Sequence, residues 1–262
     1  MERRRLLDRA AHSGEERVLL ARVLDRYEQC RTRAVPTATD FLSPAEQRAA
    51  RDLLHAAAVR EGFAFCGGYE RAERRLLLFL PDWQEEPDES EHMTALRCTY
   101  RKEDILTHRD FLGALMAQGV TREKLGDILV SDGSADLLVS RDVAAYLLQN
   151  LTGAGRVKLS VSEIGLSALR VPEPKVREIR DTVAALRLDA VAASGFSMSR
   201  GRAQELIAAG RVQLNHRETL KSDAPVAQGD VISARGLGKF EVAEVGGLSR
   251  KGRTALTLRR YE

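Results

Sequence analysis

The amino-acid sequence predicts an α+β protein made of three small domains. Segments with the 3.6-residue period of helices alternate with short apolar runs that are typical of strands. Two polar, proline-containing stretches, at 82–91 and 171–174, interrupt this pattern, so we expect domains at 1–82, 93–172 and 183–262. A hydrophobic fraction of 44% with 30% charged residues is typical of a folded, water-soluble chain.

The first domain is expected to combine helices with a small sheet. Apolar residues at helical spacing predict a helix over 15–28. A second helix should begin after Ser43, because Pro44 suits the first helical position and Glu46 completes a capping box. It should end at Gly62, and the apolar runs 63–66 and 76–80 then predict two strands.

The middle domain shows a regular order of elements. We expect a strand at 96–100, a helix capped by Thr107 and ending at Gly119, and a hairpin whose turn is Asp132-Gly133. A helix capped by Ser140 and a strand at 156–161 complete the order βαββαβ, while 153–155 should form only a turn. This order fits the ferredoxin-like split fold that RNA-recognition-motif domains share. Residues 135–139 offer no aromatic for stacking on bases, and we expect Tyr100 to be packed in the core.

The C-terminal domain should place a short helix against strands. Ser199 is a good N-cap, apolar residues recur at helical spacing through Ile207, and Gly210 suits the left-handed position at the helix end. Strand-like alternation follows at 211–215, then a turn at 215–217 and further short strands. Arg200 and Arg202 are expected on opposite flanks of the apolar stripe, both exposed.

These residues resemble the S-four domain, a small RNA-binding fold named after a ribosomal protein. The resemblance covers roughly 183–262 and rests on R-L-D at 187–189, the S-R-x-x-A-x-x-L-I-x-x-G-x-V-x-x-N run from Ser199 to Asn215, and a late G-D-x-I. His216 departs from it, because relatives often carry glycine or another turn residue there. The charge distribution agrees: residues 183–262 hold 13 Lys and Arg against 8 Asp and Glu, whereas the rest holds 28 against 30.

The whole arrangement resembles the YlmH-type family of bacterial proteins. The supporting stretches are 41–44, 67–74, 108–116, 124–128 and 185–189, although Ala185 replaces a serine that is frequent in relatives. The resemblance implies a cytoplasmic, non-catalytic factor that binds ribosomal RNA of the large subunit and peptidyl-tRNA on the ribosome, in quality control of stalled nascent chains. An alternative is a protein-interaction adaptor linked to cell division, with the basic domain secondary.

Affinity for RNA should come mainly from basic side chains that neutralise phosphates. We expect phosphate contacts from Arg200, Arg202, Arg211 and Lys221, polar contacts or local capping from Ser199 and Asn215, and a flanking contact from Lys239. Arg187 could instead pair within the chain with Asp189 or Glu205.

Signals for other classes of protein are weak. The sequence has neither an apolar run of bilayer length nor a segment typical of a signal peptide, so we expect no membrane partner. Its three cysteines and five histidines are scattered, so we expect no metal, cofactor or small-molecule substrate. Arg187-Leu188-Asp189 superficially matches the catalytic segment of pseudouridine synthases. We expect a helix-start role for Asp189, because no large catalytic domain follows it.

Overall fold

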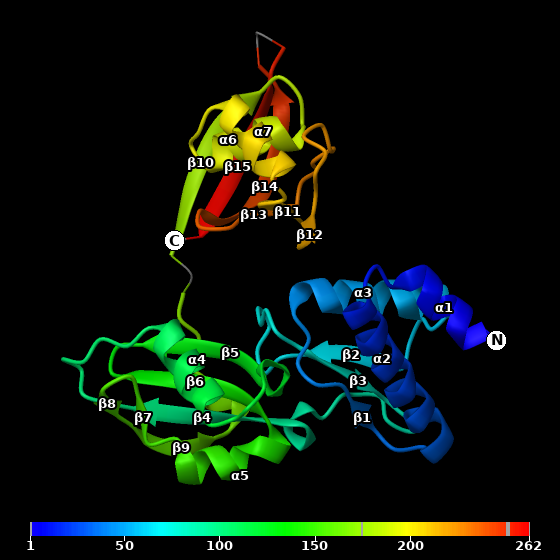
Figure 1. The fold of residues 1–262 in the computed structure, drawn as a ribbon, viewed down its shortest axis with the longest axis vertical. Coiled ribbons are helices and arrows are strands. Elements are labelled where there is room, and N and C mark those ends of the chain that lie inside the picture. Colours follow the sequence, from blue (N-terminus) through cyan, green and yellow to red (C-terminus); the bar gives the residue numbers. More distant parts are fainter. Residues whose placement is uncertain (1, 174, 250–251, 262) are drawn as a thin grey trace. The chain divides into compact units, whose positions relative to one another are not determined.

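The computed structural model describes residues 2–173, 175–249 and 252–261 (Figure 1). The chain forms two compact units that divide between Pro172 and Glu173. Both units combine helices with antiparallel sheets, which confirms the predicted α+β class. Pro174, part of the predicted second linker, lies outside the described residues. Within the described residues, none of the helices is long and apolar enough to cross a bilayer.

The first lobe of unit 1 packs three helices against a three-stranded sheet with the order β1-β3-β2. Its core contains Leu20 and Leu24 of the second helix, Leu53 of the third, and Leu77 and Phe79 of the central strand. The elements are α1 (Glu2–Ala10), α2 (Gly14–Arg33), β1 (Thr37–Ala38), α3 (Pro44–Ala56), β2 (Phe63–Cys66) and β3 (Leu76–Phe79).

Helix α3 confirms the predicted start and corrects the predicted end. Ser43 caps the helix, and the reciprocal bond from its backbone to Glu46 completes the capping box. The helix stops at Ala56 rather than at Gly62. The helix cannot continue through Ala58, which has a left-handed φ of 59°. Gly62, with a φ of 74°, then turns the chain into β2.

The second lobe confirms the βαββαβ order, with one shifted strand. Its sheet has the strand order β5-β6-β4-β9, and every pair is antiparallel. The last strand starts at Ser160 instead of at 156, because Val157 and Lys158 pair with Gly153 and Ala154 in a small hairpin of their own. The elements are η1 (Glu89–Glu91), β4 (Met93–Thr99), α4 (His108–Ala117), η2 (Arg122–Lys124), β5 (Leu125–Ser131), β6 (Ser134–Ser140), α5 (Arg141–Asn150), β7 (Gly153–Ala154), β8 (Val157–Lys158), β9 (Ser160–Ile164) and η3 (Leu166–Ala168).

Both faces of this four-stranded sheet are covered. Helices α4 and α5 cover one face, where Leu96 and Leu137 pack with Phe111. Tyr100 belongs to the same core: its ring lies 5.9 Å from that of Phe111 and its hydroxyl donates to the carbonyl of Ser131. The prediction of a packed tyrosine is therefore confirmed.

The first lobe covers the opposite face of the sheet. Met93 and Ala95 of β4 and Leu138 of β6 form a buried cluster with Phe41 and Leu78 from the first lobe. Strands alternate their side chains between two faces, so this is the face turned away from α4 and α5. The two lobes of unit 1 therefore share a hydrophobic core.

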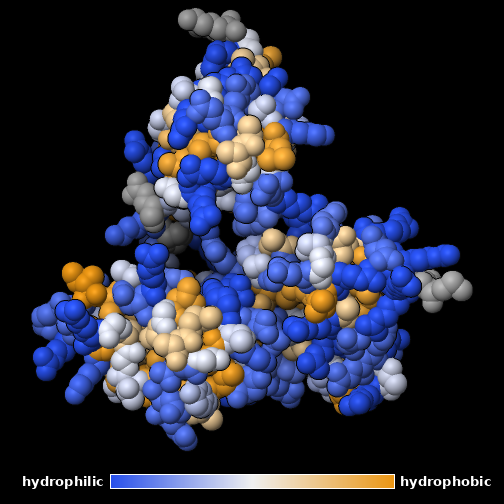
Figure 2. Space-filling view, viewed as in Figure 1, coloured by the Kyte–Doolittle hydropathy of each residue, from blue (hydrophilic) through white to orange (hydrophobic). Residues whose placement is uncertain are grey.

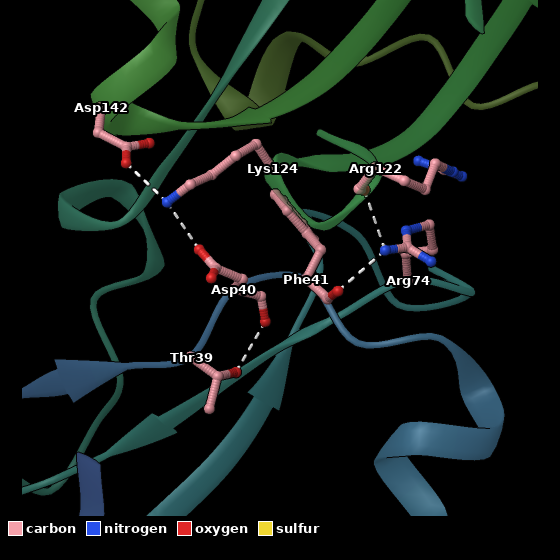
Figure 3. Close-up of polar contacts among 7 residues, drawn as sticks. All are labelled: Thr39, Asp40, Phe41, Arg74, Arg122, Lys124 and Asp142. Carbon is pink, nitrogen blue, oxygen red and sulfur yellow. Dashed lines mark hydrogen bonds and ion pairs between the residues drawn. The ribbon is translucent and has the colours of Figure 1, made fainter. Parts of the chain in front are cut away.

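Polar contacts lock the seam between the lobes (Figure 3). Arg74 donates from Nε to the carbonyl of Leu125 at 2.8 Å, and from Nη2 to the carbonyls of Phe41 and Arg122 at 2.9 and 3.2 Å. In return, Asp127 of the second lobe accepts from the backbone of Arg74 at 3.1 Å. Buried carbonyls are thus satisfied across the seam, which makes separation of the lobes unfavourable.

An ion pair lies on the other side of Phe41. Lys124 contacts Asp40 and Asp142, each at 2.7 Å, and Figure 3 shows its ammonium group between the two carboxylates. Asp40 belongs to the first lobe and Asp142 to α5, so one lysine connects both lobes. Asp40 and Phe41 are adjacent in the chain, so the ion pair and the apolar contact between the lobes are made by the same short segment.

Unit 2 packs two helices against one face of a six-stranded sheet with the order β10-β15-β14-β13-β11-β12 (Figure 1). The ring of Phe240 occupies the space that a side chain at Gly195 would need, so this close approach requires glycine. The elements are β10 (Val176–Val183), α6 (Leu188–Gly195), α7 (Arg200–Ala208), β11 (Val212–Leu214), β12 (Arg217–Glu218), β13 (Val231–Ala234), β14 (Gly238–Leu248) and β15 (Thr254–Tyr261).

Unit 2 contains one strand that the sequence did not predict and the turn that it did predict. Strand β10, which the sequence pattern did not predict, pairs with β15 along its whole length. The predicted turn after β11 is present: Asn215 and His216 have φ values of 53° and 64°, and Leu214 pairs with Arg217 across them. Two successive left-handed residues are the geometry of a type I′ hairpin. His216 therefore adopts the conformation that glycine would adopt at lower cost.

Gly126 provides a test of the shared core in unit 1. A methyl group there would lie 2.8 Å from both the Phe41 ring and Cβ of Leu138. We expect Gly126→Ala to lower the free energy of unfolding of unit 1 by about 1–3 kcal/mol, the usual cost of overpacking. Urea denaturation measures this. Gly113→Ala is the control, because nothing lies within 4 Å of its added methyl and alanine favours the helix. Equal stability of the two variants would contradict the close packing of Phe41 and Leu138 against Gly126.

Candidate nucleic-acid interface

A buried carboxylate organises the helical side of unit 2. Asp189 lies in the first turn of α6 and is 0% exposed. Its Oδ2 accepts from Nε of Arg200 at 3.0 Å and from Nε2 of Gln204 at 2.8 Å, and both oxygens contact the Arg187 guanidinium at 3.2–3.3 Å. We call these four residues the Asp189 cluster. The arrangement confirms that Asp189 starts the helix and that Arg187 pairs with it.

The cluster keeps Asp189 ionised. Burial alone raises the pKa of its carboxyl, but hydrogen bonds from Gln204, Arg200 and Arg187 outweigh burial and lower the pKa below the ordinary value. The carboxylate in turn fixes two guanidinium groups that stay accessible, because the side chains of Arg187 and Arg200 are 40% and 51% exposed. Their conformations are therefore set before any ligand arrives, which reduces the entropy cost of binding.

Lys221 borders the same cluster. The backbone N–H of Asp189 donates to the carbonyl of Ser222 at 2.9 Å, which holds the 221–224 segment against the start of α6. Lys221 is exposed beside this contact. Arg187 and Arg200 thus contact one buried acid, and the exposed Lys221 is next in sequence to a residue whose backbone bonds that acid.

Ser199 and Arg202 occupy the start of α7. The Ser199 hydroxyl accepts from the backbone N–H of Arg202 at 3.2 Å, so its polar group serves as the helix cap. Arg202 points to the flank opposite Gln204 and forms an exposed pair with Glu205 at 2.7 Å. Exposed pairs of this kind contribute little to stability, so the Arg202 guanidinium can exchange Glu205 for a phosphate at small cost.

Arg211 and Asn215 lie at the two ends of β11. Arg211 is exposed and donates to the carbonyl of Arg235, itself an exposed basic residue. The Asn215 side chain bonds Asp230 at 2.7 Å and accepts from the backbone of Val231 at 3.0 Å. Asn215 therefore holds the turn to β13, which is the local role that the sequence analysis considered for it.

Lys239 lies away from the other predicted residues. Its neighbour Phe240 points into the core beneath α6, so Lys239 points to the opposite, open face of the sheet. There its ammonium lies 5.1 Å from the centre of the Tyr261 ring, and burial lowers its pKa. The structure thus places Ser199, Arg200 and Arg202 at the start of α7 and Arg211 just before β11, while Lys221 lies in the exposed 221–224 segment that bonds the start of α6.

The open face of the sheet has alternating charges. Glu178, Arg259 and Glu241 lie side by side on three neighbouring strands. Opposite charges in register neutralise one another, so this face lacks the surplus of positive charge found on the helical side. Figure 2 shows one side of the whole molecule, on which hydrophilic residues dominate and the hydrophobic patches are small.

Three cationic or polar residues at this interface were missed or assigned elsewhere by the sequence reasoning. Arg187 and Gln204 complete the Asp189 cluster, and Arg235 lies beside Arg211. The spacing of Gln204, four residues after Arg200, was a usable signal, because such residues share one face of a helix. The contact between Arg211 and Arg235 depends on pairing of β11 with β13 and has no local signal.

Asp189 has a structural role in this cluster. Asp189 is fully buried and engaged by three side chains, an arrangement that suits support rather than attack on a substrate. Among the residues that the structure describes, no group of three His, Cys, Asp or Glu side chains is placed to hold a metal ion. Cys66 is half-buried, and burial raises the pKa of its thiol to about 11, which disfavours the reactive thiolate.

The comparisons with known proteins agree with this geometry. Residues 87–168 match the family described as "Putative RNA-binding domain in YlmH", and residues 186–232 match the S4 domain, the S-four fold. The chain is 38% identical over 226 residues to "Ribosome-associated protein quality control protein P2" of Bacillus subtilis, covering 86% of this chain and 87% of that protein.

One solved structure supports the fold. "Cell division protein ylmH from Streptococcus pneumoniae" superposes with a TM-score of 0.50 at 22% identity, and the match covers 62% of this chain and 98% of that one. Because identity is low, this likeness concerns the fold alone.

The Asp189 cluster yields a stability prediction. We expect Asp189→Asn to destabilise unit 2 by about 1–3 kcal/mol, because the buried amide replaces a carboxylate oxygen that accepts hydrogen bonds with an N–H₂ group that cannot. Urea denaturation followed by circular dichroism measures this. Asp223→Asn, which removes the same charge from an exposed position, is the control and should change stability by less than about 0.5 kcal/mol.

The same carboxyl predicts a pH dependence. Its pKa is lower in the folded than in the unfolded protein, so its stabilising contribution is complete above the unfolded value of about 3.9 and is lost as the pH falls through the folded value. The stability difference between the wild type and Asp189→Asn should therefore shrink on acidification below about pH 4. A difference that stays constant from neutral pH to pH 2 would show that the ionised carboxylate is not the stabilising species.

Proposed function

Because the chain belongs to the YlmH family, whose members join a YlmH RNA-binding domain to a C-terminal S4 domain, we propose that it binds the large ribosomal subunit and acts in ribosome-associated quality control of stalled nascent chains. The observation that carries the proposal is the 38% identity to the Bacillus subtilis quality-control protein over 86% of the chain. The preset guanidinium groups of the Asp189 cluster supply a physical basis for RNA binding.

The proposed ligands are ribosomal RNA and peptidyl-tRNA. Both are rich in A-form helices, whose deep major groove hides the base edges, so recognition would use shape and phosphates. Arg200, Arg202, Arg211 and Lys221 would contact phosphates, supported by Arg187. Ser199 and Asn215 would act by holding the helix start and the turn, and Lys239 would be a peripheral contact on the open face. The factor would be non-catalytic and would work in the cytoplasm without a cofactor.

We also propose three functional domains, at 1–82, 93–172 and 183–262. Each has an apolar cluster of its own, around α2 and α3, around α4 and α5, and beneath α6 and α7, and a further cluster joins the first two domains. The strand order β5-β6-β4-β9 supports a ferredoxin-like middle domain related to the RNA-recognition-motif fold. Its sheet would not stack bases as that fold does, because the first lobe covers the face that would be used.

Ribosome sedimentation tests the proposal. We expect the wild-type protein to sediment with large subunits from a lysate, and an Arg200/Arg202/Arg211/Lys221→Ala variant to stay at the top of the gradient, because four phosphate contacts are lost. Each lost contact should also reduce the slope of log affinity against log salt by about one. The double variants Arg200/Arg211→Ala and Arg180/Arg259→Ala lose the same charge. The second is the control for the first, because Arg180 and Arg259 lie on β10 and β15, outside the Asp189 cluster.

Two outcomes would contradict the proposal. If wild type and the four-residue variant both stay at the top of the gradient, the chain does not bind ribosomes. If the wild type keeps its partners after RNase digestion, the alternative of a protein-interaction adaptor becomes the better account.

A further inference from the structure

A groove of about 300 Å³ runs between α6 and the end of β10 in unit 2. One wall is formed by α6, which presents Ala190, Ala193 and Ser194, and the other by the 181–185 segment. All three side chains of the α6 wall are small, so a ligand can approach the helix closely. The volume is at the lower end of the range for small-ligand pockets, which suits a single sugar or nucleoside rather than a helix.

Two arginines border this groove, and both are held in place by the protein. Arg200 uses its Nε and Nη2 to contact Asp189. Arg253 uses the same two nitrogens to contact the hydroxyl and carbonyl oxygens of Thr182. Each guanidinium is thereby anchored on one edge, and Nη1 remains to face a ligand. Anchored guanidinium groups suit phosphate, which they bind with charge-assisted hydrogen bonds.

A carboxylate lines the same groove as these cations and is also oriented. Asp181 accepts from the Ser194 hydroxyl at 2.7 Å and from the backbone N–H of Thr182 at 2.7 Å. Its side chain is exposed in the groove, and each carboxylate oxygen has a further lone pair to offer. An acid beside a phosphate site is unfavourable unless the ligand brings a donor to it.

An RNA backbone has this combination of groups. Consecutive phosphates flank a ribose, and its 2′-hydroxyl is a hydrogen-bond donor that DNA lacks. We propose that the groove holds one ribose of a bound RNA strand, with the flanking phosphates on Arg200 and Arg253 and the 2′-hydroxyl donating to Asp181. The inference rests on the proposed RNA-binding function and deepens it: the groove selects RNA over DNA, because with DNA the Asp181 carboxylate would face phosphates without a donor.

Binding of an RNA hairpin and of the DNA hairpin with the same sequence, each fluorescently labelled, tests this in the full-length protein. Asp181→Ala should weaken RNA binding by about three- to tenfold, the effect of one hydrogen bond, and leave DNA binding unchanged or stronger. Arg253→Gln should weaken both ligands equally and reduce the salt slope by about one. Ala193→Trp should fill the groove and weaken RNA binding at least about tenfold.

The control for the tryptophan is Thr257→Trp on β15, in the opposite face of the sheet, which should bind RNA as the wild type does. Circular dichroism shows whether Ala193→Trp folds. If it does not, Asp181→Ala and Arg253→Gln still test the proposal, because both residues are exposed and their replacement should not disturb folding. An Asp181→Ala variant with unchanged or stronger RNA binding overturns the proposal. If only the assignment of a ribose to the groove is wrong, the wild type still binds RNA and the Arg200/Arg202/Arg211/Lys221→Ala variant does not. If the proposed function is wrong, the wild type itself fails to bind.

Discussion

The ionised carboxylate of Asp189 is the interaction on which the C-terminal unit depends. A charge without exposure to water is tolerated only when donors surround it, and here Arg187, Arg200 and Gln204 supply them. The same bonds connect the loop before α6 with the start and second turn of α7. One buried acid therefore connects the two helices and orients two guanidinium groups, so the same contacts serve the fold and the ligand surface.

The parts of the fold that could be predicted are those encoded by neighbours in sequence. The capping box at Ser43, the Asp132-Gly133 turn and the cap at Ser199 each act within a few residues, and the structure has all three. Strand β10 shows the opposite case. Its sequence alternates weakly between apolar and charged residues, and only pairing with β15, far along the chain, makes it a strand. Helix α1, mainly charged, is likewise fixed by distant contacts, since Leu7 is buried in the core of the first lobe and Arg3 pairs with two acids of α2.

The candidate site divides in the same way. The basic residues of α7 could be predicted because helical spacing determines which flank each one takes. The position of Lys239 could not, because it depends on which face of β14 packs under α6, and Phe240 decides that. The role of Arg253 also had no local signal, since its partner Thr182 lies 71 residues away. Long-range strand pairing therefore set the limit of the sequence analysis.

The apolar cluster shared by the two lobes of unit 1 has a consequence for how the chain can be divided. The sequence family covering 87–168 begins after Phe41 and Leu78, which pack on Met93, Ala95 and Leu138. A protein cut at that boundary would present an apolar sheet face to water, and a surface of that kind promotes self-association. The first two lobes should therefore stay together in any shortened form of the chain.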